Sequence, residues 1–375
     1  MSIIKVSGSL QREIRIPSRF CHLQASWQVD TLTVVFDCYL SVAMRGRSWV
    51  RVRSQCKVQS KRRRRTWFGY LAVGSEWVRI SIIRKKRQST GSVSTAFGST
   101  PVTNRQFKEF VRATAYKTFA EIPPDPKSYP GALPHMLYAG SLVFTPPPHT
   151  VDLKNLGEWW AYTKGADWRH PYGPKSNINT RDHHPVVHVA FSDALAYAKW
   201  AGKELPTEAE WEFAARGGLD GAEFAWGNEF TPGGQHMANT WQGNFPHENS
   251  CDDGFDRTSP VTAFPPNGYG LHDMIGNVWE WTTDWFSPKH QADAPKTCCI
   301  PENPRGGRQE DSYDPRQSGA KIPRKVIKGG SHLCAPNYCR RYRPAARHAE
   351  DVDTSTSHLG FRCIIRQRSA TIDQP

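Results

Sequence analysis

Residues 329–347 read GGSHLCAPNYCRRYRPAAR, and this stretch decides the fold assignment. Two cysteines, Cys334 and Cys339, lie five positions apart between a Gly-Gly pair and an arginine-rich run. Residues five apart point to opposite faces of a strand, and on a helix they lie about 140° apart around the axis. No regular element therefore brings these thiols together. Pro336 and Asn337 favour a turn between them, and a turn can do so.

Several chemistries are compatible with this cysteine pair. A structural zinc site requires four ligands. His332 lies close to the two cysteines, but no second pair of ligands completes the set. A disulfide fits the spacing, and so does a clamp for a soft cation, above all Cu(I). Arg340 and Arg341 would favour the thiolate form. Two unrelated buried cysteines fit equally well, so the pair alone leaves these alternatives open.

The composition indicates a loop-rich protein held together by large aromatic side chains. The 375 residues suffice for one large core or two modest domains, and they include 14 Trp, 29 Gly and 28 Pro with only 38% hydrophobic residues. The nine scattered cysteines are not a disulfide scaffold. The most apolar early window, residues 31–44, is interrupted by Asp37 and is too short to span a bilayer. We therefore expect a cytoplasmic protein without a membrane partner.

The formal charge of +14 is confined to the N-terminal quarter of the chain. Residues 1–90 hold 19 of the 49 Lys and Arg but only 4 of the 35 Asp and Glu, so the remainder carries 30 basic and 31 acidic residues. A nucleic-acid partner would have to be recognised by this segment alone. The rest of the chain gives no indication of one, and we expect none.

Start and stop signals become clear after residue 98. Three helices are predicted from capping patterns; the residues that mark them are Thr103 with Gln106, Ser192 with Gly202, and Thr207 with Glu210. Short strands are predicted within residues 260–264, 276–286, 325–331 and 359–367. The expected organisation is one α+β domain at 98–368, preceded by a basic segment at 1–97 and followed by a tail at 369–375.

The sequence around the cysteines resembles a known family. Residues 329–347, with DTSTSHLGFRC at 353–363, strongly resemble the closing part of formylglycine-generating enzymes, the sulfatase-modifying factor family. Four earlier runs carry the same resemblance: FAEIPPDPKSYPGALPHM, HPVVHVAFSDALAYAKWAGKELPTEAEWEFAARGG, ANTWQGNFP and PPNGYGLHDMIGNVWEWTTDWF. The likeness runs nearly continuously from about residue 100 to residue 368.

The resemblance implies both a fold and an activity. Family members have a loop-rich α+β fold related to C-type lectins. They are copper-dependent oxidoreductases that use O2 and a thiol reductant to convert the cysteine of a Cys-x-Pro-x-Arg segment to Cα-formylglycine. The substrate is an unfolded or partly folded sulfatase, and the enzyme is expected to be a monomer.

The resemblance also assigns site residues. Cys334 and Cys339 match the cysteines that bind Cu(I), and Ser331 matches a serine beside that centre. Trp279 is expected to pack against the same pocket, and Arg347 either lines it or is a structural ion-pair partner. Two structural Ca2+ sites are implied. One would comprise Asn239, Asp253 and the carbonyls of Thr240 and Phe255; the other would comprise Asp273, Glu280 and the carbonyls of Met274, Gly276 and Val278.

The sequence departs from the family in two respects. Ala198, Ala215 and Pro344 occupy positions where vertebrate members carry disulfide cysteines, which agrees with a reducing cytoplasm. Residues 1–97 lack the family's opening segment with its Phe-x-Met-Gly-like stretch. They fit either a genuine basic extension or an out-of-frame translation or misplaced start, and we favour the second interpretation, in which the segment is disordered or mistranslated.

Two other functions remain alternatives. One is a non-catalytic, lectin-like binding or scaffold module, which would not need both cysteines. The other is an iron-dependent sulfoxide synthase, whose metal requires two histidines and a carboxylate on one face. His183, His184 and His188 are poor candidates, because the last two would alternate along a strand expected in VVHVAF.

Overall fold

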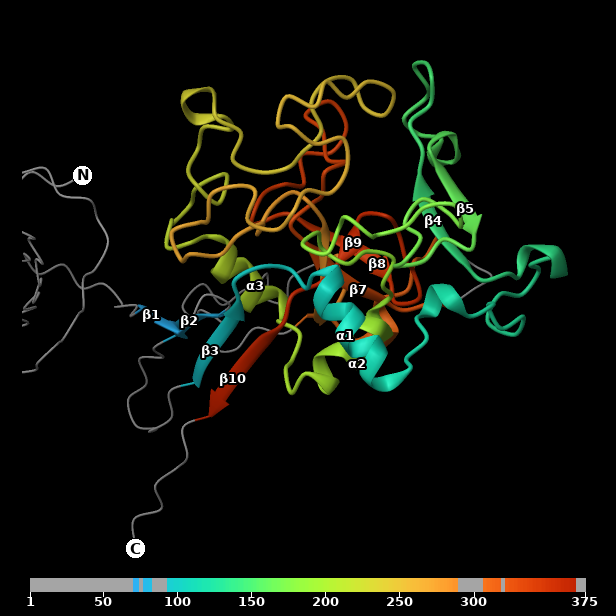
Figure 1. Ribbon diagram of the computed structural model, residues 1–375, viewed down its shortest axis with the longest axis horizontal. Coiled ribbons are helices and arrows are strands. Elements are labelled where there is room, and N and C mark those ends of the chain that lie inside the picture. The colour runs from blue at the N-terminus through green and yellow to red at the C-terminus, as the bar shows by residue number, and fades with distance from the viewer. Residues whose placement is uncertain (1–69, 74–76, 83–92, 289–305, 318–320, 369–375) are drawn as a thin grey trace, which may run out of the picture. The chain divides into compact units, whose positions relative to one another are not determined.

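The computed structural model describes residues 70–73, 77–82, 93–288, 306–317 and 321–368 (Figure 1). All of them belong to one compact unit, Thr66–Pro375. The apolar window at residues 31–44 and most of the basic segment lie outside the described residues. Among the described helices, none combines the length and the apolar character needed to cross a membrane.

Two helices begin where their capping boxes predict. Helix α1, Asn104–Thr114, starts after Thr103, whose Oγ1 accepts a hydrogen bond from Gln106 N at 3.4 Å. Helix α3, Glu208–Ala215, starts after Thr207, whose Oγ1 accepts from Glu210 N at 3.2 Å. In both boxes the Gln or Glu side chain also accepts from the N-cap backbone. These two helix starts are confirmed.

The start predicted for the remaining long helix was wrong by two residues. Helix α2, Phe191–Trp200, has Ala190 as its N-cap, and Ser192 lies inside the first turn. Ala190 has no side-chain acceptor for the first turn, and the buried Asp193 carboxylate inside the helix accepts from Ala190 N at 2.8 Å, which is the reverse bond of a capping box. The predicted terminator is confirmed, because Gly202 has a left-handed φ of 65° directly after the helix.

The strands form three sheets, and most of the described chain between them is loop (Figure 1). The antiparallel sheet β1-β2-β3-β10 joins both ends of the described chain, since β3 pairs with β10. The sheet β8-β7-β6-β9 carries the cysteine loop at the end of β7, and β4 pairs with β5. The bounds are β1 Tyr70–Val73, β2 Trp77–Ile82, β3 Val93–Gly98, β4 Gly140–Phe144, β5 Trp160–Lys164, β6 Trp279–Trp285, β7 Arg324–Lys328, β8 Arg347–Asp351, β9 Leu359–Gly360 and β10 Ile364–Arg368.

The predicted loop-rich α+β class is confirmed, with two local differences. Residues 260–264 form turns and not a strand, because Thr262 has a positive φ of 73°, which is incompatible with extended backbone. The domain boundary drawn at residue 98 falls at the end of β3, so it separates that strand from the sheet in which it pairs.

Buried aromatic rings hold the loops together, as the composition indicated. The larger cluster packs α1, α2, α3 and the strands around rings such as Phe107, Trp211 and Phe361. A smaller cluster lies beside the cysteine loop and comprises Phe144, Trp159, Trp241, Phe245, Leu333 and Ala335. Each large ring removes about 150–250 Å2 from water, which compensates for the small number of regular elements.

Candidate active site

The cysteine loop begins with a turn that only glycine can make. Strand β7 ends at Lys328, and Gly329 and Gly330 follow with left-handed φ values of 96° and 71°. A Cβ on Gly329 would lie 3.1 Å from Met274 O, and one on Gly330 would lie 2.9 Å from Tyr342 N. The Gly-Gly pair therefore permits both the backbone conformation and the close packing of the loop.

Two successive turns then bring the cysteines together. Cys334 N donates to Ser331 O at 2.9 Å, and Cys339 N donates to Ala335 O at 3.0 Å. The two sulfurs lie 3.2 Å apart. The thiols thus meet across a loop, in the way that the Pro-Asn turn between them suggested.

The two thiols have different environments and different acidities. Cys334 is buried, and burial raises the pKa of its thiol well above the ordinary value. Cys339 is half-buried; the hydrogen bond from Cys334 and the nearby charge of Arg341 lower its pKa to about 7. Near neutral pH the proton of the pair therefore stays on Cys334, and Cys339 carries the negative charge.

These donors fit a soft, low-coordinate cation. The described residues contain no group of three or more His, Cys, Asp and Glu able to hold a metal, so a four-ligand zinc site is not formed there. Cu(I) is satisfied by few thiolate ligands, and the pair supplies two sulfurs already in contact. Within the described part of the chain, the residues at this loop therefore fit copper better than a four-ligand zinc site.

Ser331 and Tyr338 are the neighbours of the thiols in this loop. Ser331 is fully buried, and its Oγ accepts from Leu333 N at 3.2 Å. Tyr338 is 37% exposed and stacks on Phe245 with ring centroids 4.5 Å apart, while Trp159 meets it edge-on at 5.9 Å. Tyr338, which directly precedes Cys339 in the sequence, thus presents a partly exposed aromatic ring at the site.

Trp279 and Arg347 lie within the sheet that carries the loop. Trp279 is buried, with its ring 5.7 Å from that of His348. Arg347 donates to Glu208 Oε2 at 2.8 Å and to Ser287 O at 2.7 Å. These contacts favour the structural ion-pair interpretation of Arg347.

The first implied calcium site has a feature that favours a cation. Asn239 Oδ1 is buried and has no hydrogen-bond partner among the described residues, although its Nδ2 donates to Arg257 O. Asp253 lies at the same loops, accepting from Thr240 N and Phe255 N, both at 3.0 Å. Burial raises the pKa of Asp253, a cost that a bound cation would offset. The oxygen donors here fit Ca2+.

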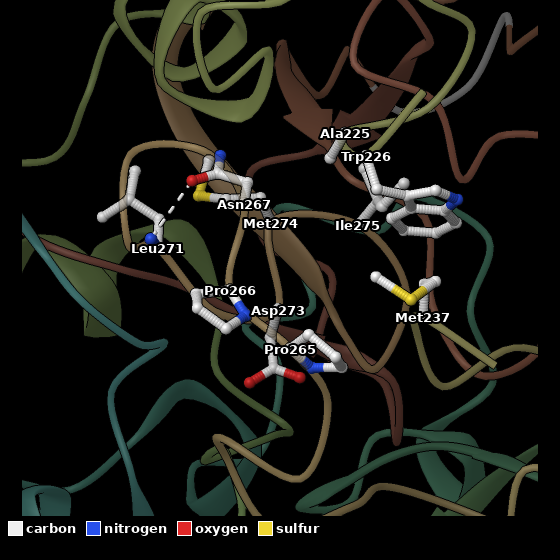
Figure 2. Close-up of a pocket in the computed structure, with 10 residues that line it drawn as sticks. All are labelled: Ala225, Trp226, Met237, Pro265, Pro266, Asn267, Leu271, Asp273, Met274 and Ile275. Carbon is white, nitrogen blue, oxygen red and sulfur yellow. Dashed lines mark hydrogen bonds between the residues drawn. The ribbon is translucent and has the colours of Figure 1, made fainter. Parts of the chain in front are cut away.

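The second implied set does not fit calcium in the form the resemblance suggests. Both oxygens of Glu280 are engaged by the buried Arg362, and Trp211 Nε1 donates to Glu280 Oε2 at 2.6 Å. The Asp273 carboxylate accepts from Thr262 N at 3.1 Å, and in Figure 2 it lies beside Pro265. A guanidinium thus neutralises Glu280, so this carboxylate is not free for Ca2+.

The comparisons with known proteins decide the family. Residues 72–367 match the model of the sulfatase-modifying factor enzyme 1-like domain. The chain belongs to this family. It is similar to the formylglycine-generating enzymes of Mycobacterium tuberculosis (55% identity over 265 residues, 70% of this chain and 85% of that protein) and Streptomyces coelicolor (46% over 264 residues, 70% and 76%). It is also similar to a Bos taurus protein named inactive Cα-formylglycine-generating enzyme 2 (37% over 273 residues, 70% and 74%).

The sulfatase-modifying factor domain starts earlier than the sequence suggested. The match begins at residue 72, within β1, so β1, β2 and β3 belong to the family domain. The interpretation of residues 1–97 as disordered or mistranslated falls mostly on residues outside the described ones and stays a prediction.

The three histidines considered for iron do not converge in this sulfatase-modifying factor domain. His184 Nδ1 lies 3.0 Å from Thr258 Oγ1, while His188 contacts Ser141 Oγ at 2.6 Å and Pro171 O at 2.8 Å. The strand expected through His184 and His188 was wrong, because His188 has a φ of 58°. The rings of His184 and His188 are therefore held by separate hydrogen bonds.

Sequence reasoning missed Tyr338 as part of the site of this sulfatase-modifying factor domain. It concentrated on thiols and carboxylates, whereas Tyr338 acts through ring stacking on Phe245. The available signal was a tyrosine directly before Cys339, next to an arginine-rich run.

Proposed function

We propose that this chain converts a cysteine in a Cys-x-Pro-x-Arg segment of an unfolded or partly folded sulfatase to Cα-formylglycine. The observation that carries the proposal is the 3.2 Å contact between the buried Cys334 and the half-exposed Cys339. The similarity to proteins named formylglycine-generating enzyme supports the same reaction. A purely binding module would have no use for a poised thiol pair.

The proposed reaction is an oxidation with O2 as acceptor, and its balance requires a reductant. The substrate CH2–SH becomes an aldehyde, its sulfur leaves as H2S, and the substrate gives up two electrons. Two molecules of a thiol reductant give two more and form a disulfide. O2 takes all four electrons and is reduced to two molecules of water. Hydrolysis of the oxidised substrate, a thioaldehyde, consumes one molecule of water, which supplies the aldehyde oxygen and releases the sulfur as H2S.

In this proposal Cys334 and Cys339 hold Cu(I). When bound, Cu(I) supplies a soft centre that accepts a third thiolate and exchanges single electrons. Cys339 holds its negative charge near neutral pH, so it needs little deprotonation to become a ligand. Cys334 is buried, so it forms the inner side of the site.

In this proposal Tyr338 binds and orients the substrate, while Ser331, which is fully buried, acts from within the cysteine loop. Leu333 N donates to Ser331 Oγ, which leaves the hydroxyl proton free to be donated to a neighbouring acceptor. The exposed face of Tyr338 offers a flat apolar surface for an extended peptide with a proline. Calcium, where bound at Asn239 and Asp253, would fix the adjoining loops. We place the reaction in the cytoplasm, since the described cysteines are all unpaired.

The test is a conversion assay with the copper-loaded protein. It is incubated with a Cys-x-Pro-x-Arg peptide, O2 and a thiol reductant, and mass spectrometry follows the change from CH2–SH to CHO. Cys334→Ser and Cys339→Ser should abolish product, whereas Cys251→Ser, which changes a half-buried cysteine on another loop, should not. No product from folded, copper-loaded protein would overturn the proposal. Peptide binding without product would favour the scaffold alternative.

A further inference from the structure

Helix α3 contacts the strand that leads into the cysteine loop through two buried side chains. The first is Lys328, the last residue of β7, which is completely buried. Its Nζ lies 3.1 Å from Glu212 Oε2 and 3.8 Å from Glu208 Oε1, both on α3. Lys328 immediately precedes Gly329, so the ion pair fixes the point where the loop leaves the sheet.

The second side chain is Trp211, in the middle of α3. Its Nε1 donates to Glu280 Oε2 at 2.6 Å, which fixes the orientation of the indole. A Cβ on Gly329 would lie 3.2 Å from Cζ2 of this ring, so the indole packs directly against the first glycine of the turn. The ring also lies 5.7 Å from Lys328 Nζ.

On its other side the loop is held by hydrogen bonds to backbone atoms, and one of them joins His332 Nδ1 and Asn277 O at 2.8 Å. Gly276 N donates to Gly329 O, and His332 N donates to Asn277 O, both at 3.0 Å. The conformation of Gly329 is therefore fixed between these amides and the indole. Glycine is the most flexible residue type, so its conformation depends on such external contacts.

We propose that Trp211 and Lys328 are positioning residues, which hold the Gly329 turn so that Cys334 meets Cys339. In this proposal they act through the loop. The inference rests on the proposed function for its catalytic meaning. The closeness of the thiols can nevertheless be measured without any substrate.

The test uses the equilibrium between the Cys334–Cys339 dithiol and its disulfide, measured in glutathione buffers with the metal-free protein. Lys328→Met and Trp211→Phe should each disfavour the disulfide about tenfold, equivalent to roughly 30 mV in reduction potential. Lys328→Arg keeps the cation and should restore most of the wild-type constant. Lys325→Met is the matched control. This lysine is buried on the same strand, but its Nζ bonds Thr283 O at 2.7 Å and lies over Trp285.

The outcomes separate positioning from general stability and from the proposed reaction. Folded Lys328→Met and Trp211→Phe proteins with the wild-type constant would overturn the inference, as would an equal shift in Lys325→Met. If Lys328→Met does not fold, Trp211→Phe and the charge-neutral double variant Lys328→Met, Glu212→Gln decide in the same assay. A wild-type protein that makes no formylglycine would contradict the proposed function. The dithiol–disulfide equilibrium would still test whether Trp211 and Lys328 position the loop.

Discussion

Arg362 donates two hydrogen bonds to Glu280, from Nε at 2.7 Å and from Nη2 at 2.8 Å, and both side chains are fully buried. Its remaining donors reach the carbonyls of Gly98, His272 and Asp273 at 2.9–3.1 Å. One guanidinium thus joins the end of β3, a central loop and β6. Because burying charges costs free energy, the main contribution of this pair is to specify the arrangement of these segments.

Replacing Arg362 with Met should therefore be strongly destabilising. The change leaves the Glu280 carboxylate buried without its cation, which typically costs about 3–5 kcal/mol. The free energy of unfolding from urea titration measures the loss. Arg308→Met, which removes an exposed pair with Asp311, should leave the midpoint unchanged. Equal midpoints for the two variants would contradict this interpretation of Arg362.

The thiol pair predicts selective, pH-dependent alkylation of Cys339. In the metal-free protein its reaction rate with iodoacetamide should rise with pH through a midpoint near 7, while the buried Cys334 reacts far more slowly. Cys334→Ala removes the largest cause of the low pKa and should move the midpoint toward about 8.5. At pH 7 the rate should then fall about tenfold. Peptide mapping checks both sites, with Cys251 as an internal reference; a midpoint unaffected by Cys334→Ala would refute the coupling.

Calcium should stabilise the protein through Asn239 and Asp253. A concentration of about 100 times the dissociation constant adds roughly 2.7 kcal/mol of unfolding free energy. Asn239→Ala removes the unpartnered Oδ1 and should abolish the calcium-dependent rise in melting temperature. Asp256→Ala, a neighbouring change at an 80% exposed side chain, should retain it. Calorimetry with and without EGTA makes the comparison, and a calcium response preserved in Asn239→Ala would exclude this site.

Acid should destabilise the fold through buried histidines such as His188. Burial lowers the pKa of His188 to about 4, so the unfolded chain binds its proton at higher pH than the folded protein does. The contribution is full above the ordinary value near 6.5 and is lost as pH falls toward 4, at about 1.4 kcal/mol per pH unit. His188→Gln should flatten the dependence of stability on pH in this window. His135→Gln, an exposed change, should not, and identical slopes for all three proteins would argue against His188.

Local signals predicted much of the fold. The boxes at Thr103 and Thr207 place both hydrogen-bond partners three residues apart, so sequence alone specifies where α1 and α3 begin. The start of α2 was missed because its N-cap, Ala190, has no side-chain acceptor and is fixed by the Asp193 carboxylate, which accepts from Ala190 N. That choice depends on tertiary packing around a buried carboxylate, which no local pattern reports.

Some features of the candidate site could likewise be predicted from the sequence, and others could not. The cysteine pair, its turn and the Gly-Gly entrance can be read from consecutive residues. The neutralisation of Glu280 could not, because Arg362 lies far along the chain and only the folded sheet brings the two together. The same holds for Trp211, whose indole reaches Gly329 and Glu280 from a helix that sequence reasoning treated as scaffold.

The pairing of β3 with β10 also determines when this domain can finish folding. Phe97 pairs with Ile364, so the ribosome must synthesise almost the whole domain before β3 acquires its second neighbour. Until then one edge of β3 is open to other chains, and contacts between residues so distant in sequence form slowly. Translation that stops before β10 should leave a nascent chain that depends on chaperones to remain in solution.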